Sequence, residues 1–264
     1  ESRVSVARGT QYRKPKSFSI TKNINDSRYG GNIKLVRRTK NTRDYIQIQK
    51  RVDSQIGLER EIRLLNRRIF SPHPNLLRID CFTHHDEQSC CNVQWVVNIY
   101  IEYLEKDLEQ EIAEKRQKSA YYLEHELIYL IENLSMGVSN FEKCQNPHRH
   151  IRPSNVFIDS FGVYKYIDHE YIDLGLKSSF DKSRKCLTAP ELLNGSPKDY
   201  QVDQCKADVF SLGMTILEAA TLQPSCELYD YKRGRIHFKE LEARLSKVST
   251  KYSQSIHNLL SSML

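Results

Sequence analysis

The stretch PHRHIRPSNVF at residues 147–157 decides the fold when it is taken together with four other short strings. Downstream lie APE at 189–191 and DVFSLG at 208–213. Upstream lies IEYLEKDL at 101–108. Further upstream, REI at 60–62 is followed by HPN at 73–75, and we count these two as one string. Each string alone is a weak signal, but their order along residues 17–264 is specific.

The string at 147–157 resembles the catalytic loop H-R-D-L-K-P-x-N of protein kinases, and residues 189–191 resemble the A-P-E motif of the same family. The match is closest to the serine/threonine kinase group. The resemblance implies an α+β, bilobal fold that binds a nucleotide between a strand-rich N-lobe and a helical C-lobe. It divides the chain into a basic lead-in (1–16), a kinase-like N-lobe (17–102) and a kinase-like C-lobe (103–264), and implies one more helix after residue 264.

Composition excludes several other classes of protein. The chain has 264 residues, of which 39% are hydrophobic and 9% aromatic, so intrinsic disorder is excluded. It contains no run of 18 apolar residues, so no membrane-spanning segment is expected. Seven irregularly spaced cysteines do not suit a disulfide scaffold. We therefore expect an intracellular protein, either cytoplasmic or cytoskeleton-associated.

Hydrophobic periodicity predicts strands in the first half of the chain and helices in the second. One helix interrupts the strands, because Leu58, Ile62, Leu65 and Ile69 share a helical face. The strands are predicted at 17–21, 33–37, 45–50, 76–82 and 93–102, with a polar loop at 83–89. Further helices are predicted around 127–141, 203–220, 238–248 and 253–264, the second of them central because it is so apolar.

The net charge of +7 is unevenly distributed. Residues 1–70 hold 18 Lys and Arg against 6 Asp and Glu, and the remainder holds 22 against 27. A basic N-lobe suggests a protein partner with an acidic surface, within a larger assembly. A nucleic-acid partner is not expected, because aromatic residues are not interleaved with the basic ones.

The resemblance aligns His150 with the Asp that accepts the substrate proton in protein kinases. A carboxylate is ionised at pH 7, whereas a histidine there is near neutral and has a different reach. The magnesium ligands of the family fall on Asn155 and Asp168, with His169 and Glu170 replacing the Phe and Gly of D-F-G. Asp173 is a competing reading, five residues later.

The lysine that contacts the phosphates in the family aligns with Gln49, one residue before Lys50. In a regular strand Lys50 would face the other way, and a bulge could reverse that. Glu61 is the expected carboxylate partner, and Arg152 replaces the lysine of the catalytic loop.

The phosphate-cradling loop keeps only its last glycine region, Gly30 and Gly31. Other positions retain the family's structural motifs. The residues aligned with the adenine pocket, which core packing explains slightly better, are Ile33, Ile101, Tyr103, Leu104 and Phe157. The structural motif residues are His148, Arg149, Ala189, Pro190, Glu191 and Asp208.

Four altered chemical parts beside intact structural motifs favour a pseudokinase, a noncatalytic binding, scaffold or allosteric module. On this reading no cofactor is required, although the site could still hold ATP and Mg²⁺. The alternatives are a weak or atypical serine/threonine kinase that transfers phosphate from ATP, and a basic module that docks on an acidic partner or filament.

Overall fold

A computed structural model describes residues 18–24, 33–38, 43–89, 92–167, 187–193 and 202–264. The described residues up to Tyr103 form one compact unit, and those from Leu104 onward form a second. The first unit is built around a sheet, and the second is mostly helical.

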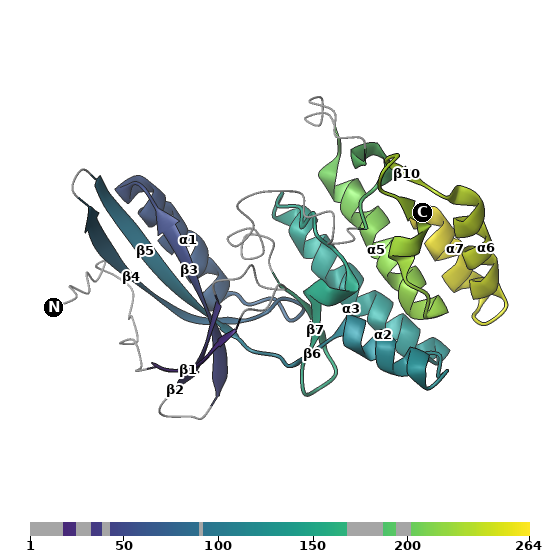
Figure 1. Ribbon diagram of the computed structural model, residues 1–264, viewed down its shortest axis with the longest axis horizontal. Helices are drawn as coiled ribbons and strands as arrows, with labels where there is room; N and C mark the ends of the chain where they lie inside the picture. Colours follow the sequence, from purple (N-terminus) through teal and green to yellow (C-terminus); the bar gives the residue numbers. More distant parts are fainter. Residues whose placement is uncertain (1–17, 25–32, 39–42, 90–91, 168–186, 194–201) are drawn as a thin grey trace. The chain divides into compact units, whose positions relative to one another are not determined.

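The first unit is an antiparallel five-stranded sheet in the order β1-β2-β3-β5-β4 (Figure 1). Helix α1 (Gln55–Phe70) packs on it by contacts with β3 and β4. The strands are β1 (Phe18–Ile24), β2 (Ile33–Arg38), β3 (Asp44–Val52), β4 (Ile79–Ser89) and β5 (Asn92–Glu102). Each predicted strand is therefore present, and the predicted helix lies between β3 and β4.

The polar segment 83–89 is part of β4, so its prediction as a loop is wrong. Thr83 pairs with Asn98, and the pairing continues to Ser89 and Asn92. Strand pairing uses backbone N–H and C=O groups, so it does not require apolar side chains on either face. Cross-strand contacts such as the His84 and Trp95 rings, 6.2 Å between centroids, add to the pairing.

The second unit is organised around α5 (Gln204–Thr221), which contacts three other helices and has most of its side chains buried (Figure 1). This confirms the prediction of a central helix. The other α-helices among the described residues of this unit are α2 (Leu108–Gln117), α3 (Glu124–Lys143), α6 (Phe238–Ser249) and α7 (Gln254–Met263). Short strands form two small sheets: β6 (Lys106–Asp107), β7 (Val156–Ile158) and β8 (Tyr164–Tyr166), and β9 (Tyr229–Asp230) with β10 (Arg235–Ile236).

No helix among the described residues has the length and apolarity needed to cross a lipid bilayer. The cysteines in the described part, Cys81, Cys144, Cys205 and Cys226, are all free thiols.

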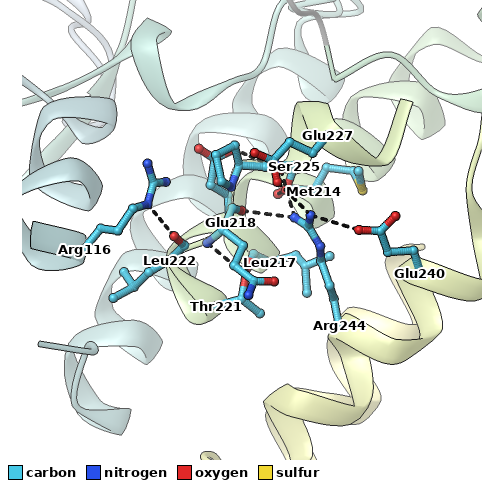
Figure 2. Close-up of polar contacts among 12 residues, drawn as sticks. Arg116, Met214, Leu217, Glu218, Thr221, Leu222, Ser225, Glu227, Glu240 and Arg244 are labelled. Carbon is cyan, nitrogen blue, oxygen red and sulfur yellow. Dashed lines mark hydrogen bonds and ion pairs between the residues drawn. The ribbon is translucent and has the colours of Figure 1, made fainter. Parts of the chain in front are cut away.

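A buried arginine connects α6 to the loop that follows α5 (Figure 2). Arg244 is 4% exposed, and its Nη1 donates to the carbonyl oxygens of Gln223 and Pro224, at 3.3 and 2.9 Å. Its Nη2 lies 3.2 Å from a carboxylate oxygen of Glu227 and 3.5 Å from one of Glu240. The guanidinium group thus supplies donors to two carbonyls of the loop that follows α5.

Glu218 lies in the same region with only 9% of its surface exposed (Figure 2). Its Oε2 accepts a hydrogen bond from the Ser225 backbone N–H at 2.9 Å. Burial raises the pKa of the Glu218 carboxyl from 4.5 to about 7, and Glu109 acts in the same direction while Arg116 and Arg244 oppose it. The folded protein therefore binds a proton here that the unfolded chain releases at lower pH.

We expect Glu218→Gln to remove a pH dependence of stability. Between pH 4.5 and 7 the wild type loses free energy of unfolding as pH rises, because only the unfolded chain has released the Glu218 proton. The Gln variant keeps an oxygen acceptor for Ser225, so its free energy of unfolding should lie within about 1 kcal/mol of the wild type at pH 5 and exceed it by about 3 kcal/mol at pH 8. Urea denaturation at both pH values measures this.

Glu242→Gln is the matched control, because Glu242 is exposed on α6. It should leave the difference in free energy of unfolding between pH 5 and pH 8 unchanged. An equal effect of both variants would show that net charge, rather than burial of Glu218, controls the pH dependence.

Candidate functional site

The first unit contains a close ion pair between β3 and α1. Lys50 Nζ lies 2.6 Å from Glu61 Oε2, with 22% and 7% of the two side chains exposed. Glu61 lies on the buried face of α1 together with Leu58 and Leu65. The pair therefore places an ammonium group at a defined position on the sheet, held by a buried carboxylate.

Local sequence explains why the pair forms across so short a connection. Only Asp53 and Ser54 separate β3 from α1, and Ser54 Oγ caps the helix by accepting the Gly57 N–H at 3.1 Å. A Cβ atom at Gly57 would lie 2.7 Å from Val52 Cγ1 and 3.0 Å from Ser54 Oγ, so a larger residue in this first turn of α1 would force one of these side chains to shift.

The alignment of Gln49 with the phosphate-contacting lysine position does not agree with this geometry. Gln49 is exposed, and its Nε2 lies 3.5 Å from Asn98 Oδ1 on the other face of the sheet. Lys50 shares its face with the buried Ile46 and Ile48. The pairing of β3 with β5 is continuous and contains no bulge, so a regular strand is enough to turn Lys50 toward Glu61.

In the second unit, Asp208 at the start of α5 holds the loop at 147–155. Its two carboxylate oxygens accept the backbone N–H groups of His148 and Arg149, at 2.6 and 2.7 Å. Arg149 adopts a left-handed backbone conformation with φ of 64°, which lets both N–H groups point at one carboxylate. Asp208 is 2% exposed, so these bonds lie in a low-dielectric environment.

The His148 side chain is fully buried and supports the other side of the same loop. Its Nε2 lies 2.6 Å from the carbonyl oxygen of Ile167, just after β8. Its ring lies 5.0 Å from that of Phe141 and 5.4 Å from that of Tyr166, measured between centroids. Burial, and to a lesser degree Asp208, raises the pKa of the Tyr166 hydroxyl, so this tyrosine stays neutral.

Asn155 fits the role of a ligand for a hard cation. It is 1% exposed, and its Nδ2 donates to the His150 carbonyl oxygen at 2.6 Å, which fixes the amide orientation. Its Oδ1 is buried and has no hydrogen-bond partner among the described residues. An amide oxygen of this kind suits Mg²⁺, which prefers oxygen ligands. Among the described residues, no three or more His, Cys, Asp or Glu side chains form a cluster that could hold a metal ion.

The remaining candidate residues of the second unit lie in the loop at 147–155, in β7 and at 189–191. His150 and Arg152 are half-buried, and the His150 backbone N–H lies 3.3 Å from His148 Nδ1. Phe157 is fully buried in β7. Pro190 and Glu191 begin a short 3₁₀ helix, and Ser211 Oγ on α5 donates to the nearby Leu187 carbonyl oxygen at 2.7 Å.

The structure describes some of the other predicted nucleotide- and metal-binding positions and not others. Ile101 is buried in β5 and pairs with Ile46 and Ile79, as core packing requires. Tyr103 and Leu104 are half-buried. The backbone of Ile33 begins β2. Outside the described residues lie Gly30, Gly31 and Asp168, together with the competing Asp173. Nucleotide and metal binding by these positions stay predictions.

Sequence reasoning missed the supports of the loop, namely Phe141, Tyr166 and the Ile167 carbonyl. Phe141 was assigned only to the apolar stripe of its helix, and nothing in the local sequence connects it with His148. The correct face of Lys50 was visible, because Ile46, Ile48 and Lys50 alternate along one strand.

We expect Asp208→Asn to lower the free energy of unfolding by about 2–3 kcal/mol, because an amide cannot accept both N–H bonds without turning its own NH₂ toward a donor. Asp203→Asn is the matched control, since Asp203 caps the same helix and Asn caps equally well. Urea denaturation at pH 7 measures both variants. A loss for Asp203→Asn as large as that for Asp208→Asn would contradict the special role of Asp208.

Comparisons with known proteins agree with this geometry. The profile of the protein kinase domain matches residues 31–264. The chain is 23% identical over 227 residues to the serine/threonine-protein kinase Nek2 of Mus musculus, covering 80% of this chain and 45% of that protein. It is 24% identical to Nek5 of Homo sapiens over 148 residues, or 56% of this chain and 21% of the other. The dual specificity protein kinase zak2 of Dictyostelium discoideum is 31% identical over 131 residues, or 46% and 19%.

The chain thus spans less than half of the length of these relatives. The comparisons overturn the prediction of a noncatalytic module, because the matched family and all three relatives are kinases, and they favour the kinase alternative. Part of the error has a structural cause: the alignment placed Gln49 at the lysine position of the family, whereas Lys50 is the residue that pairs with Glu61. With its profile match over residues 31–264, the chain belongs to the protein kinase domain family.

Proposed function

We propose that this chain is a weak or atypical serine/threonine protein kinase that transfers phosphate from ATP to a protein hydroxyl. The observation that carries the proposal is the Lys50–Glu61 ion pair, at 2.6 Å. A lysine held by a buried carboxylate is positioned before ATP binds, and phosphoryl transfer depends mostly on such positioning and on electrostatic stabilisation.

Separate residues take the separate tasks of the transfer. Lys50 neutralises phosphate oxygens, and Glu61 keeps its ammonium group in place. Asn155, with its unpartnered Oδ1, and Asp168 hold the metal ion. Mg²⁺, when bound, supplies positive charge to the ATP phosphates. Asp208 and His148 keep the loop that carries Asn155 in one conformation.

The atypical feature is His150, which occupies the position of the proton-accepting Asp. Either the His150 imidazole or a water molecule accepts the proton of the substrate hydroxyl. A positioned base contributes about 10²–10⁴-fold to rates of this kind. Replacement of a carboxylate by a group with another reach therefore slows the reaction without removing the positioning that the other residues supply.

The substrate class follows from the relatives, two of which are named as serine/threonine kinases. An ATP-dependent reaction and four free thiols in the described part are both typical of the cell interior, and we infer that setting.

We expect purified protein to phosphorylate dephosphorylated casein slowly, with radiolabelled ATP and Mg²⁺. His150→Asp should raise the initial rate by about 10²–10⁴-fold, because it restores an ionised acceptor. Lys50→Met should abolish the transfer, because it removes the phosphate contact. Lys247→Met, an exposed position on α6, is the matched control and should leave the rate unchanged.

Two results would contradict this proposal. One is the absence of phosphotransfer in both the wild type and His150→Asp, with native circular dichroism. The other is activity that survives Lys50→Met and the Asp168→Ala variant, since it would come from a contaminating kinase. His150→Ala separates the two proton acceptors: an unchanged rate assigns the role to water, and a large loss assigns it to His150.

ATP binding gives a second, independent prediction. Excess ATP with Mg²⁺ should raise the melting temperature by several degrees, because a ligand that binds only the folded state stabilises it by RT ln(1 + [L]/Kd), about 1.4 kcal/mol at ten times Kd. The rise should shrink when EDTA replaces Mg²⁺. Asn155→Ala should remove this difference between Mg²⁺ and EDTA.

Each variant is compared with its own nucleotide-free melting temperature, so a general loss of stability in Asn155→Ala does not enter the comparison. The absence of any shift at millimolar ATP would overturn nucleotide binding by this chain. A shift of equal size with EDTA would overturn the assignment of Asn155 as a metal ligand.

A further inference from the structure

Helix α1 has a buried face and a separate exposed face. The buried face carries Leu58, Glu61 and Leu65 and packs on β3 and β4. The exposed face carries Ile56, Arg60, Arg63, Arg67 and Phe70, which we call the α1 stripe. The stripe makes no contribution to the Lys50–Glu61 pair, which lies on the buried side.

The α1 stripe follows a regular helical spacing. Its residues recur at intervals of 4, 3, 4 and 3, so they form one seam along the helix. Fourteen residues separate the first from the last, which corresponds to about 21 Å of helix. The two ends are apolar and open, since Ile56 is 79% and Phe70 68% exposed, and Leu64 beside the seam is 39% exposed.

The middle of the α1 stripe carries three positive charges, and Glu59, four residues before Arg63, is the one exposed acidic residue of the helix. Within the described part of the chain, the guanidinium groups of Arg60, Arg63 and Arg67 have no ion pair and no side-chain hydrogen bond. Like charges at spacings of three and four residues repel on a helix surface. A sequence that concentrates this repulsion between two exposed apolar side chains is explained if a negatively charged surface covers it.

We propose that the α1 stripe docks an acidic amphipathic helix of a partner protein. Its carboxylates lie opposite Arg60, Arg63 and Arg67, and its apolar residues cover Ile56 and Phe70. Residues of the α1 stripe recur at alternating intervals of three and four, which is the spacing of contact residues between two packed helices. Guanidinium groups pair well with carboxylates in two-point geometry. The proposal is independent of phosphotransfer, because it uses none of the residues assigned to ATP.

Other occupants fit these observations less well. The lead-in at residues 1–16 has five basic residues and one acidic residue, so its net charge has the same sign as that of the α1 stripe. A lipid surface needs a continuous apolar face, whereas here three arginines separate the apolar ends. A polynucleotide would pair with the arginines but would leave Ile56 and Phe70 without an apolar partner.

The test uses a fluorescein-labelled 21-residue helical peptide on an Ala and Gln background. One face of the peptide carries five positions at the same intervals as the α1 stripe. Leu occupies the two outer positions, and Glu occupies the three positions between them. Fluorescence anisotropy at 0.15 M salt should show binding to the wild-type chain. The triple variant Arg60→Gln, Arg63→Gln and Arg67→Gln should raise Kd at least tenfold, since Gln keeps helix propensity but removes the charge.

The matched control is Lys232→Gln, Lys239→Gln and Lys247→Gln, three exposed lysines of the second unit. It removes the same net charge and should change Kd less than twofold. Ile56→Ala with Phe70→Ala should raise Kd several-fold, because the apolar contacts are lost. A peptide with Gln in place of Glu should not bind. Single Arg→Gln variants extend the series if the triple variant loses its native circular dichroism.

Four outcomes would overturn the proposal. The first is no binding of the Glu peptide at 100 μM. The second is an equal loss of affinity in the α1 variant and the lysine control, which would indicate an effect of net charge alone. The third is an α1 variant that loses binding to duplex DNA or to phosphatidylserine vesicles but keeps the peptide. The fourth is a wild-type dimer in sedimentation that the α1 variant dissociates, which would assign the surface to a second copy.

Discussion

The carboxylate of Asp208 holds the centre of the second unit together. It accepts hydrogen bonds from the backbone N–H groups of His148 and Arg149. Asp208 lies on α5 and is only 2% exposed to solvent. Without these bonds a buried and a partly buried backbone N–H would lack acceptors, which costs free energy in a low-dielectric interior. This arrangement supports the left-handed backbone of Arg149 and the contact of His148 Nε2 with the Ile167 carbonyl oxygen. It also supports the loop to which the Asn155 amide is hydrogen-bonded.

The first unit depends on a different constraint, the alternation of side chains along β3. Because Ile46 and Ile48 are buried, Lys50 faces α1 and reaches Glu61. The same helical register that turns Glu61 inward turns Arg60, Arg63 and Arg67 outward. One short helix therefore holds the Lys50 ammonium group through Glu61 and also presents a charged surface.

Much of the fold was accessible from sequence, because motif order and hydrophobic periodicity are local properties. The five strands of the sheet and the central α5 follow from such patterns. The second half of β4 did not, because its pairing with β5 is made by backbone groups that leave no mark on composition. The site was predicted less well. An alignment shifted by one residue made Lys50 look misplaced, and that shift contributed to the wrong inference of a noncatalytic domain.

The sequence by itself determined the family resemblance, the order of the elements and the identity of the unusual residues, above all His150 in the place of an aspartate. These are statements about which residues follow one another. Only the tertiary structure decided that Lys50 rather than Gln49 meets Glu61, that Asn155 keeps a buried oxygen without a partner, and that three arginines share one exposed face with two apolar ends. The physical reason is that pairing register and burial arise from contacts between distant segments, so no local pattern specifies them alone.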